Sequence, residues 1–534
     1  MGKDGEKFIR LGAPEVPPEI DRAEGLFLRG RCEQGLAVLD AAVRRLGDAP
    51  DGWMAVLVPA MKFAQCFERS ALLNRWLRLV ERRWMRLRPE TSAAREAVGE
   101  EISVLRLWVQ WKTLGPGIGM EPLDEAFAQI RHWKPWMVQF QWDVLLNFNR
   151  FDAVDESISR GPPCRIERGT ITYGARILTL ALKFYLQMRS RPAEVLFRSA
   201  IRKLEEVPGF HSHFMRAAAY CRLAWIYRIR GEYRAGLELL RKAEAIDRRI
   251  NSRSLRSLRS QSEGTLSILT GDYEGATRRF LIDRDPGRPA VYSRRVSSAH
   301  AVLTAAYCQL QMGHHARAER YVRRAKDLLR GQSLSHVHGT LHMVRGDIKL
   351  ATGDPADLRA AGGRYDKAER VYRATGAPPL YLSLLYARRG AYYLKRQNYQ
   401  SALRCAEVSG LNGSDTGGTP FWGESFLLKS FLLLETGMPH AHLYEEVLKG
   451  LGTIQDPVTL FKTIANLYIY TWDLGDFLDL TDLHMKQIEK LRERLEPELF
   501  ARLYRMYITE RVVERMRKRF GTAENVKLRR VSAP

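Results

Sequence analysis

The chain has 534 residues, of which 45% are hydrophobic and 27% charged, and its formal net charge at pH 7 is +24. This length is too great for one compact core, and the composition excludes a disordered chain, a collagen-like chain and a disulfide scaffold. Only 19 of the 85 basic residues are Lys, so Arg supplies most of the positive charge.

Targeting signals and paired cysteines are missing from the sequence. There is no run of 18 apolar residues, and the N-terminus has no apolar stretch of signal-peptide length. The cysteines are far apart, none forms a CxxC motif, and several fall in apolar helical patterns. They are Cys32, Cys66, Cys164, Cys221, Cys308 and Cys405. We therefore expect a protein of the reducing cytoplasm with no membrane partner.

The chain starts with 20 residues that contain three prolines and no helical periodicity, which predicts a flexible N-terminal tail over 1–20. Residues 21–165 follow as divergent helical hairpins, the first of which turns at Gly30. Long helical patterns over about 52–88 and 92–114 precede a Gly/Pro break, LGPGIGMEP.

This first region is rich in tryptophan. Five of the 11 tryptophans lie between positions 108 and 142. They are Trp108, Trp111, Trp133, Trp136 and Trp142. We interpret them as core residues of the divergent hairpins; the alternative is an aromatic docking surface, since Trp is enriched at interface hot spots.

A repeated pattern governs the chain from residue 166 to 490. In the first clear copy, Leu223, Ala224 and Tyr227 share a helix face, and a turn at Gly231 leads to Tyr233 and a second amphipathic helix. Corresponding residue types recur along the chain, and the turn positions are 38 to 44 residues apart. These positions are Gly231, Gly271, Gly313, Gly353, Gln397, Gly437 and Gly475. In the fourth copy an insertion of about ten residues precedes Gly363.

The repeated residue types have a physical purpose. A small residue in the first helix lets the second helix approach closely, and glycine adopts a positive φ cheaply at the turn. One hairpin cannot bury its apolar face alone, so the hairpins must stack. The sequence thus predicts an all-α superhelical solenoid of stacked antiparallel helix hairpins, followed by a C-terminal helix and basic tail over 491–534.

The order of residue types, namely small, aromatic, Gly, aromatic, Ala, aromatic or Leu, Ala, resembles the tetratricopeptide repeat family. The repeat here is near 40 residues instead of 34, and the customary closing Pro is mostly absent, as in the longer, irregular repeats of bacterial regulatory proteins. The resemblance implies a peptide or protein ligand in the concave groove. Candidate groove residues on the first helices are Trp225, Arg228, Gln261, Thr265, Tyr307 and Asp347.

Motifs of catalysis are not found. There is no P-loop, HExxH, nucleophile elbow, kinase set or deaminase signature, so we expect no enzyme and no cofactor. The best candidate for a metal site is SHVHGTLH, where His338 and His342 are one helical turn apart and His336 is nearby. No carboxylate or thiolate partner is suggested locally, so we interpret these histidines as surface or core-edge residues.

Positive charge is concentrated in the middle of the chain. Residues 201–330 contain 26 Lys and Arg against 13 Asp and Glu, an excess of 13. Stacking would align the arginines of successive repeats into a stripe that binds phosphates or an acidic protein segment. The alternatives are that these cations complement helix dipoles or reflect a GC-rich genome. The predicted stripe comprises Arg248, Arg249, Arg253, Arg256, Arg259, Arg278, Arg279, Arg294, Arg295, Arg320, Arg323 and Arg324.

Two functions therefore follow from the sequence. The first is a non-catalytic scaffold or adaptor that binds a partner protein in its concave groove, as a regulatory subunit of a larger complex. The second is a nucleic-acid-associated regulatory protein that uses the arginine stripe.

Overall fold

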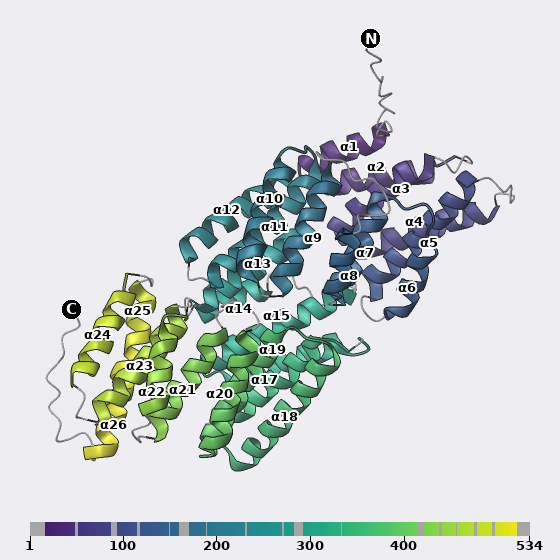
Figure 1. Cartoon of the computed structure of the whole chain (residues 1–534). Helices are drawn as coiled ribbons and strands as arrows, with labels where there is room; N and C mark the ends of the chain where they lie inside the picture. Colours follow the sequence, from purple (N-terminus) through teal and green to yellow (C-terminus); the bar gives the residue numbers. More distant parts are fainter. Residues whose placement is uncertain are drawn as a thin grey trace, which may run out of the picture.

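The computed structural model describes residues 17–47, 52–86, 93–114, 118–148, 150–159, 170–187, 189–229, 232–269, 272–281, 292–332, 334–414, 421–436, 441–454, 457–474, 478–493 and 497–520. Within these ranges the regular structure is helical and includes no β-strand (Figure 1). The predicted all-α class is confirmed.

The N-terminal region consists of helices that differ in length and spacing. They are α1 (Pro18–Leu28), α2 (Cys32–Arg44), α3 (Trp53–Cys66), α4 (Ser70–Arg86), α5 (Ala93–Leu114), α6 (Glu121–Ala128), α7 (Pro135–Asn147) and α8 (Phe151–Ser159). The tryptophans of this region belong to the core: Trp108, Trp111 and Trp142 are buried, and Trp133 and Trp136 pack against the hydrophobic cluster that contains Trp108 and Trp111.

Two boundaries differ from the sequence prediction. The expected tail over 1–20 is too long, because α1 begins at Pro18 and buries Ile20; proline at the first helical position needs no N–H partner. The pattern over 52–88 is two helices instead of one. The chain turns at Glu68, whose φ of +57° is incompatible with a continuous α-helix.

The rest of the chain forms a regular array. Its helices are α9 (Ile171–Leu186), α10 (Ser190–Glu205), α11 (Phe210–Ile229), α12 (Tyr233–Ile250), α13 (Arg253–Leu269), α14 (Tyr273–Leu281), α15 (Tyr292–Gln311), α16 (His315–Leu329), α17 (His336–Thr352), α18 (Pro355–Ala374), α19 (Pro379–Lys395), α20 (Tyr399–Ser414), α21 (Phe421–Thr436), α22 (Ala441–Leu451), α23 (Pro457–Leu474) and α24 (Leu478–Leu491). The final segments are α25 (Pro497–Tyr504), the π-helical turn η3 (Arg505–Thr509) and α26 (Glu510–Phe520).

The predicted stacking of hairpins is confirmed. Each odd-numbered helix from α9 to α23 packs against the even-numbered helix that follows, and each hairpin contacts the next one (Figure 1). The architecture is therefore an array of tetratricopeptide-like helix hairpins.

The turn residues behave as expected where the structure describes them. Gly313, Gly353 and Gln397 have φ values of +79°, +76° and +56°. The other predicted turn positions, at 231, 271, 437 and 475, lie outside the described residues. The insertion before Gly363 does not form a loop but lengthens α18, whose N-terminus is capped by the Asp354 carboxylate accepting from the Ala356 N–H at 2.7 Å.

The small residues of the first helices allow close contact with aromatic rings. A methyl group added at Gly346 on α17 would lie 2.6 Å from the ring of Tyr365 on α18, which is fully buried. Gly264 on α13 and Phe280 on α14 are related in the same way, at 3.0 Å. The aromatic ring thus fills the space that a side chain would occupy, and the two helices pack closely.

The array also folds back on itself, which the sequence did not predict. Helices ten positions apart are in contact: α1 with α11, α3 with α13, and α5 with α15. Glu24 on α1 accepts from the Phe210 N–H at 2.6 Å, and the Ser252 hydroxyl donates to the Cys66 carbonyl at 3.0 Å. One hydrophobic cluster, with residues from Ile20 to Leu266, spans these contacts.

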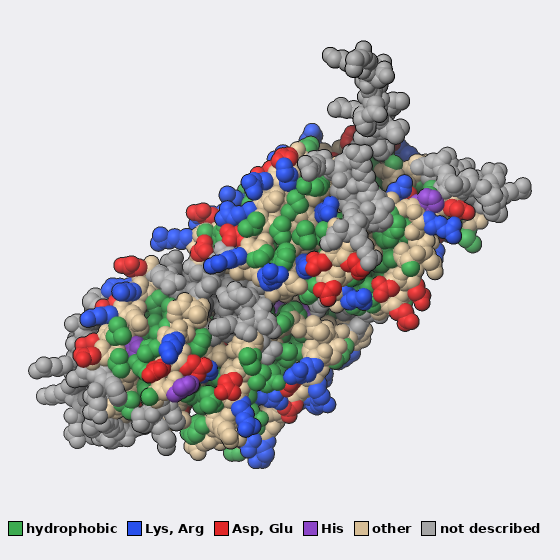
Figure 2. Space-filling model, in the orientation of Figure 1, with side chains coloured by type: hydrophobic (Ala, Val, Ile, Leu, Met, Phe, Trp, Pro, Cys, Tyr) green, Lys and Arg blue, Asp and Glu red, His purple; other side chains and the backbone are tan. Residues whose placement is uncertain are grey.

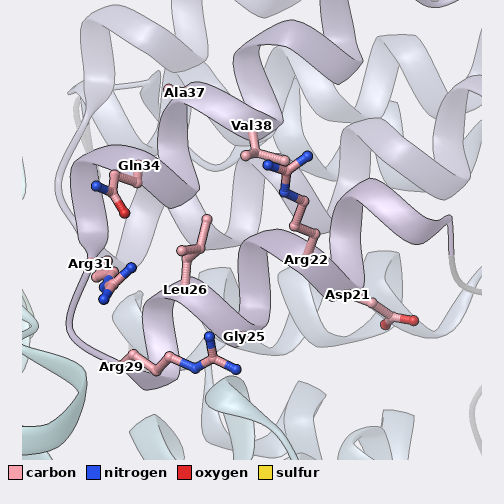
Figure 3. A pocket seen from close by; sticks show the side chains of 9 residues that line it. All are labelled: Asp21, Arg22, Gly25, Leu26, Arg29, Arg31, Gln34, Ala37 and Val38. Atoms are coloured by element: carbon pink, nitrogen blue, oxygen red, sulfur yellow. The ribbon is translucent and has the colours of Figure 1, made fainter.

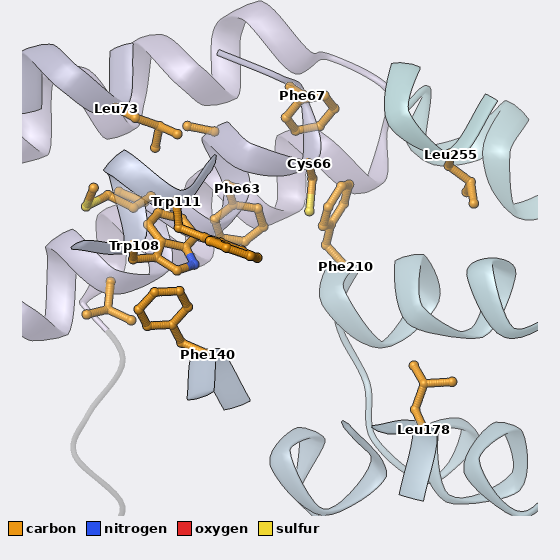
Figure 4. Packing of buried hydrophobic residues seen from close by; sticks show 14 of the residues in the cluster. Phe63, Cys66, Phe67, Leu73, Trp108, Trp111, Phe140, Leu178, Phe210 and Leu255 are labelled. Atoms are coloured by element: carbon orange, nitrogen blue, oxygen red, sulfur yellow. The ribbon is translucent and has the colours of Figure 1, made fainter. Parts of the chain in front are cut away.

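Phenylalanine rings form the centre of this junction. Phe27 on α1 lies 4.7 Å from Phe63 and 5.6 Å from Phe210, measured between ring centroids. Phe67 is 5.4 Å from Phe210, so rings from α1, the end of α3 and α11 are in mutual contact. Figure 4 shows three of these rings, Phe63, Phe67 and Phe210. Buried aromatic clusters of this kind contribute strongly to stability, because each ring removes a large apolar area from water.

We expect Gly346→Ala to lower the free energy of unfolding by about 1–3 kcal/mol, because the buried Tyr365 ring has no free space to move into. Urea unfolding measures this value. The matched control is Gly363→Ala on α18, where an added methyl group meets no atom within 4 Å; it should gain about 0.5–1 kcal/mol from helix propensity. Equal stability of the two variants would contradict the proposed contact.

Candidate functional site

The first helices of neighbouring hairpins bring polar side chains together. Tyr307 on α15, Asp347 on α17 and Arg388 on α19 lie in a row. The Arg388 guanidinium donates to the Tyr307 hydroxyl at 3.3 Å, lies 5.3 Å from the centre of the Tyr307 ring, and is 4.0 Å from the Asp347 carboxylate. Two of the predicted groove residues, Tyr307 and Asp347, are therefore joined through Arg388, which sequence reasoning missed.

Repeat spacing was the signal that could have identified Arg388. Position 347 follows position 307 by about one repeat, and position 388 follows by about one repeat more. Equivalent positions of stacked hairpins lie side by side, so one missing member of such a series can be inferred from the others.

Burial affects the pKa values of the charged groups in this row. Asp347 is buried and accepts a hydrogen bond from the Tyr365 hydroxyl at 2.8 Å. Its burial raises the pKa of the carboxyl group, although the charge of Arg388 and the Tyr365 hydrogen bond oppose the rise. Burial also disfavours the charge of Arg388, but the neighbouring Tyr307, Asp347 and Glu424 outweigh it and hold the pKa of Arg388 above its ordinary value.

The row continues into the C-terminal hairpins. Glu424 on α21 and Lys462 on α23 occupy the next two hairpins, and the Lys462 amine lies 5.4 Å from the centre of the Tyr507 ring. Burial opposes the charge of Lys462, but Tyr507, Tyr273, Tyr307 and Glu424 together raise its pKa. No carboxylate of the described residues lies within 4.0 Å of this amine.

Tyrosines from α14 and α15 thus lie within electrostatic range of a lysine on α23. Burial, together with Tyr307, raises the pKa of Tyr273 to about 12, so its hydroxyl stays protonated and can donate. We name this group of residues the inner polar cluster. It comprises Tyr273, Tyr307, Asp347, Arg388, Glu424, Lys462 and Tyr507.

The other predicted groove residues lie on the first helices of two earlier hairpins, α11 and α13. The Trp225 ring packs edge-on against Tyr185 at 4.8 Å, and the Arg228 guanidinium lies 5.1 Å from the centre of the Trp225 ring. Gln261 on α13 donates to the Ser297 hydroxyl on α15 at 3.1 Å, whereas the Thr265 hydroxyl donates to a carbonyl of its own helix.

The histidines of SHVHGTLH are engaged in packing and capping. His336 packs on Tyr381 at 4.8 Å and lies 6.4 Å from His300, and burial lowers its pKa to about 4. The Nδ1 atom of His338 lies 3.2 Å from the N–H of Ser335, the residue that caps the N-terminus of α17. Among the described residues, no three His, Cys, Asp or Glu side chains are grouped as metal ligands.

The predicted arginine stripe is divided between paired and exposed side chains. Arg259 is only 15% exposed and forms ion pairs with Glu263, Asp247 and Glu244. Arg256 also lies near Asp247, at 4.0 Å, Arg279 lies 3.5 Å from the Asp272 carboxylate, and Arg248 pairs with Glu244 at 3.0 Å although it is exposed.

The rest of the stripe is more open to solvent. Arg249, Arg278, Arg320 and Arg323 are exposed. Arg253, Arg295 and Arg324 are half-buried, and the side chain of Arg294 lies outside the described residues. Figure 2 shows Lys and Arg side chains interspersed with acidic ones along the edge formed by α10 and α12.

Comparison with known proteins gives distant structural similarity and no match of sequence. No family model matches the chain, and no curated protein matches it. Among solved structures, the chain is similar to one described as "Crystal Structure of Rap Protein Complexed with Competence and Sporulation Factor", with 11% identity and a TM-score of 0.47. The similarity covers 69% of this chain and 99% of the other. At this distance no partner or residue role is transferable, and the assignment as a tetratricopeptide-like repeat protein is based on the helix packing above.

In the described part of the chain, none of the helices combines the length and apolar character that crossing a bilayer requires.

The raised pKa of Asp347 leads to a prediction about pH. As pH rises from the ordinary pKa of 3.8 through the folded-state pKa, the folded state holds the proton longer than the unfolded state, so stability falls. At pH 7 the Asp347 carboxylate is ionised, and its burial lowers the stability of the folded state. We expect Asp347→Asn to raise Tm at pH 7, with a gain that shrinks toward pH 4 in thermal melts.

Tyr365→Phe is the counterpart variant. It removes the hydroxyl that donates to the buried carboxylate and should lower Tm at pH 7. A lower Tm for Asp347→Asn at pH 7 would show instead that the ion pair with Arg388 outweighs the cost of burial.

Proposed function

We propose that the protein is a non-catalytic helical-repeat scaffold that binds an extended segment of a partner protein along its inner face, as a cytoplasmic regulatory subunit of a larger complex. The observation that carries this proposal is the inner polar cluster, in which successive hairpins each contribute one polar side chain. A segment lying across the hairpins would meet these side chains one after another.

The cluster has donors to spare for such a ligand. Arg388 has five N–H donors, of which one contacts Tyr307, and 29% of its side chain is exposed. Lys462 adds an ammonium group beside the Tyr507 ring. The neighbouring tyrosines supply hydroxyls and flat apolar faces, so the surface suits peptide groups and mixed side chains.

The state of the cysteines also favours a binding role over catalysis. Burial raises the pKa of Cys66, Cys221 and Cys308 to about 12 in each case. These thiols are therefore protonated at neutral pH, whereas a nucleophilic cysteine must be a thiolate.

Site-specific crosslinking tests the proposal. A photoreactive residue at position 307 should capture a discrete partner from native lysate, and Arg388→Gln combined with Lys462→Gln should reduce that product severalfold by removing both cations. A photoreactive residue at position 399, on the exposed side of α20, is the negative control. Arg404→Gln combined with Arg370→Gln, at exposed positions of α20 and α18, is the matched charge control. Equal capture from positions 307 and 399, or capture that the double variant leaves unchanged, would contradict binding at the inner polar cluster.

Exposed arginines support the second candidate, a nucleic-acid-associated regulatory protein. Arg278, Arg320 and Arg323 are exposed on α14 and α16. Reversing all three to Glu should abolish retention on a mixed-sequence DNA or RNA oligomer at low salt, since phosphate contacts dominate such affinity. Unchanged retention, or a weak dependence on salt in the unaltered chain, would remove this candidate.

A further inference from the structure

The first hairpin of the chain carries a basic hollow on its surface. The hollow has a volume of about 610 Å³ and lies between α1 and α2 (Figure 3). Its apolar lining comes from Leu26, Ala37 and Val38, and three arginines surround it: Arg22, Arg29 and Arg31. Asp21 is its one acidic lining residue.

Tertiary contacts place one further arginine next to the α1–α2 turn. Gly30, at the α1–α2 turn, has a φ of +72°, and a side chain there would approach the Arg249 carbonyl to 3.5 Å. The Cys32 sulfur lies 3.7 Å from the Ile250 carbonyl. The α12–α13 turn, about 220 residues further along the chain, thus lies directly against the α1–α2 turn and adds the exposed Arg249.

Most acidic groups near this junction are already engaged within the chain. Glu33 pairs with Arg69, Asp247 lies near Arg256 and Arg259, and Glu24 accepts from the Phe210 N–H. In contrast, Arg22, Arg29, Arg31 and Arg249 form no ion pair with any described residue. We name these four residues the N-terminal arginine surface.

We propose that the N-terminal arginine surface is a docking site for an acidic segment of a partner protein that carries an aliphatic side chain between its carboxylates. Guanidinium groups bind carboxylates in a bidentate manner, and the excess of unpaired arginines gives the charge complementarity. The hollow is large enough for an aliphatic side chain, which would cover Leu26 and Val38 and remove their apolar surface from water.

The lining favours a protein over a nucleic acid. None of the residues around the hollow is aromatic, so it offers no platform on which a base could stack. An apolar lining also has no counterpart on a phosphate backbone. This surface is separate from the inner polar cluster, so the docking site is a second function and does not depend on the first.

Fluorescence anisotropy with a labelled peptide tests the proposal. The probe is a 12-residue peptide built from Asp-Leu-Glu triplets, titrated with the full chain at low and at physiological salt. We expect saturable binding that weakens with salt, and a loss of about tenfold or more in Arg29→Glu combined with Arg31→Glu. A peptide with Gly in place of each Leu should bind severalfold more weakly, because it cannot cover the apolar lining.

The control is an equal change of net charge elsewhere. Arg359→Glu combined with Arg370→Glu, at exposed positions of α18, should leave peptide binding unchanged. Equal losses in the two double variants would overturn the proposal, because only net charge would then matter. Absence of binding, equal affinity for the Gly peptide, or a DNA or RNA oligomer that binds through Arg29 and Arg31 more tightly than the peptide would also overturn it.

Discussion

Close contact between a helix backbone and the aromatic ring of its partner helix is the constraint on which this structure depends. Where α17 lacks a side chain at Gly346, the Tyr365 ring of α18 occupies the space, and Gly264 and Phe280 repeat the arrangement. Two helices joined in this way form a closely packed hairpin, and such hairpins stack on one another in a regular array. The inner polar cluster is brought together by that stacking.

The packing of the hairpins has an electrostatic cost and a benefit. It places the Asp347 carboxylate where water is largely excluded, which disfavours its charge, and it places Arg388 and the Tyr365 hydroxyl beside it in partial compensation. The same confinement strengthens polar contacts that a ligand would make there, since fewer water molecules compete. A few partly buried polar side chains can therefore suffice to bind a ligand.

The two proposed binding surfaces differ in how their charges are balanced. The inner polar cluster alternates acidic and basic residues, from Asp347 to Arg388, Glu424 and Lys462, so its recognition depends on the order of groups along a ligand. The N-terminal arginine surface has an excess of one sign around an apolar hollow, so its recognition depends on net charge and one apolar contact. Salt should weaken ligand binding more strongly at the N-terminal arginine surface than at the inner polar cluster, because its arginines are exposed.

Local sequence by itself determined the helices, the hairpins and the turns at Gly313, Gly353 and Gln397, because apolar periodicity and turn residues act within a few residues of chain. It also singled out Tyr307 and Asp347 as candidate binding residues. Only the tertiary structure decided that Arg388 joins them, that Arg259 is taken up by internal ion pairs, and that Arg249 lies beside Arg29 and Arg31. The physical reason is that small rotations between hairpins accumulate over the array until helices ten positions apart are in contact. This accumulated rotation cannot be inferred from any short stretch of sequence.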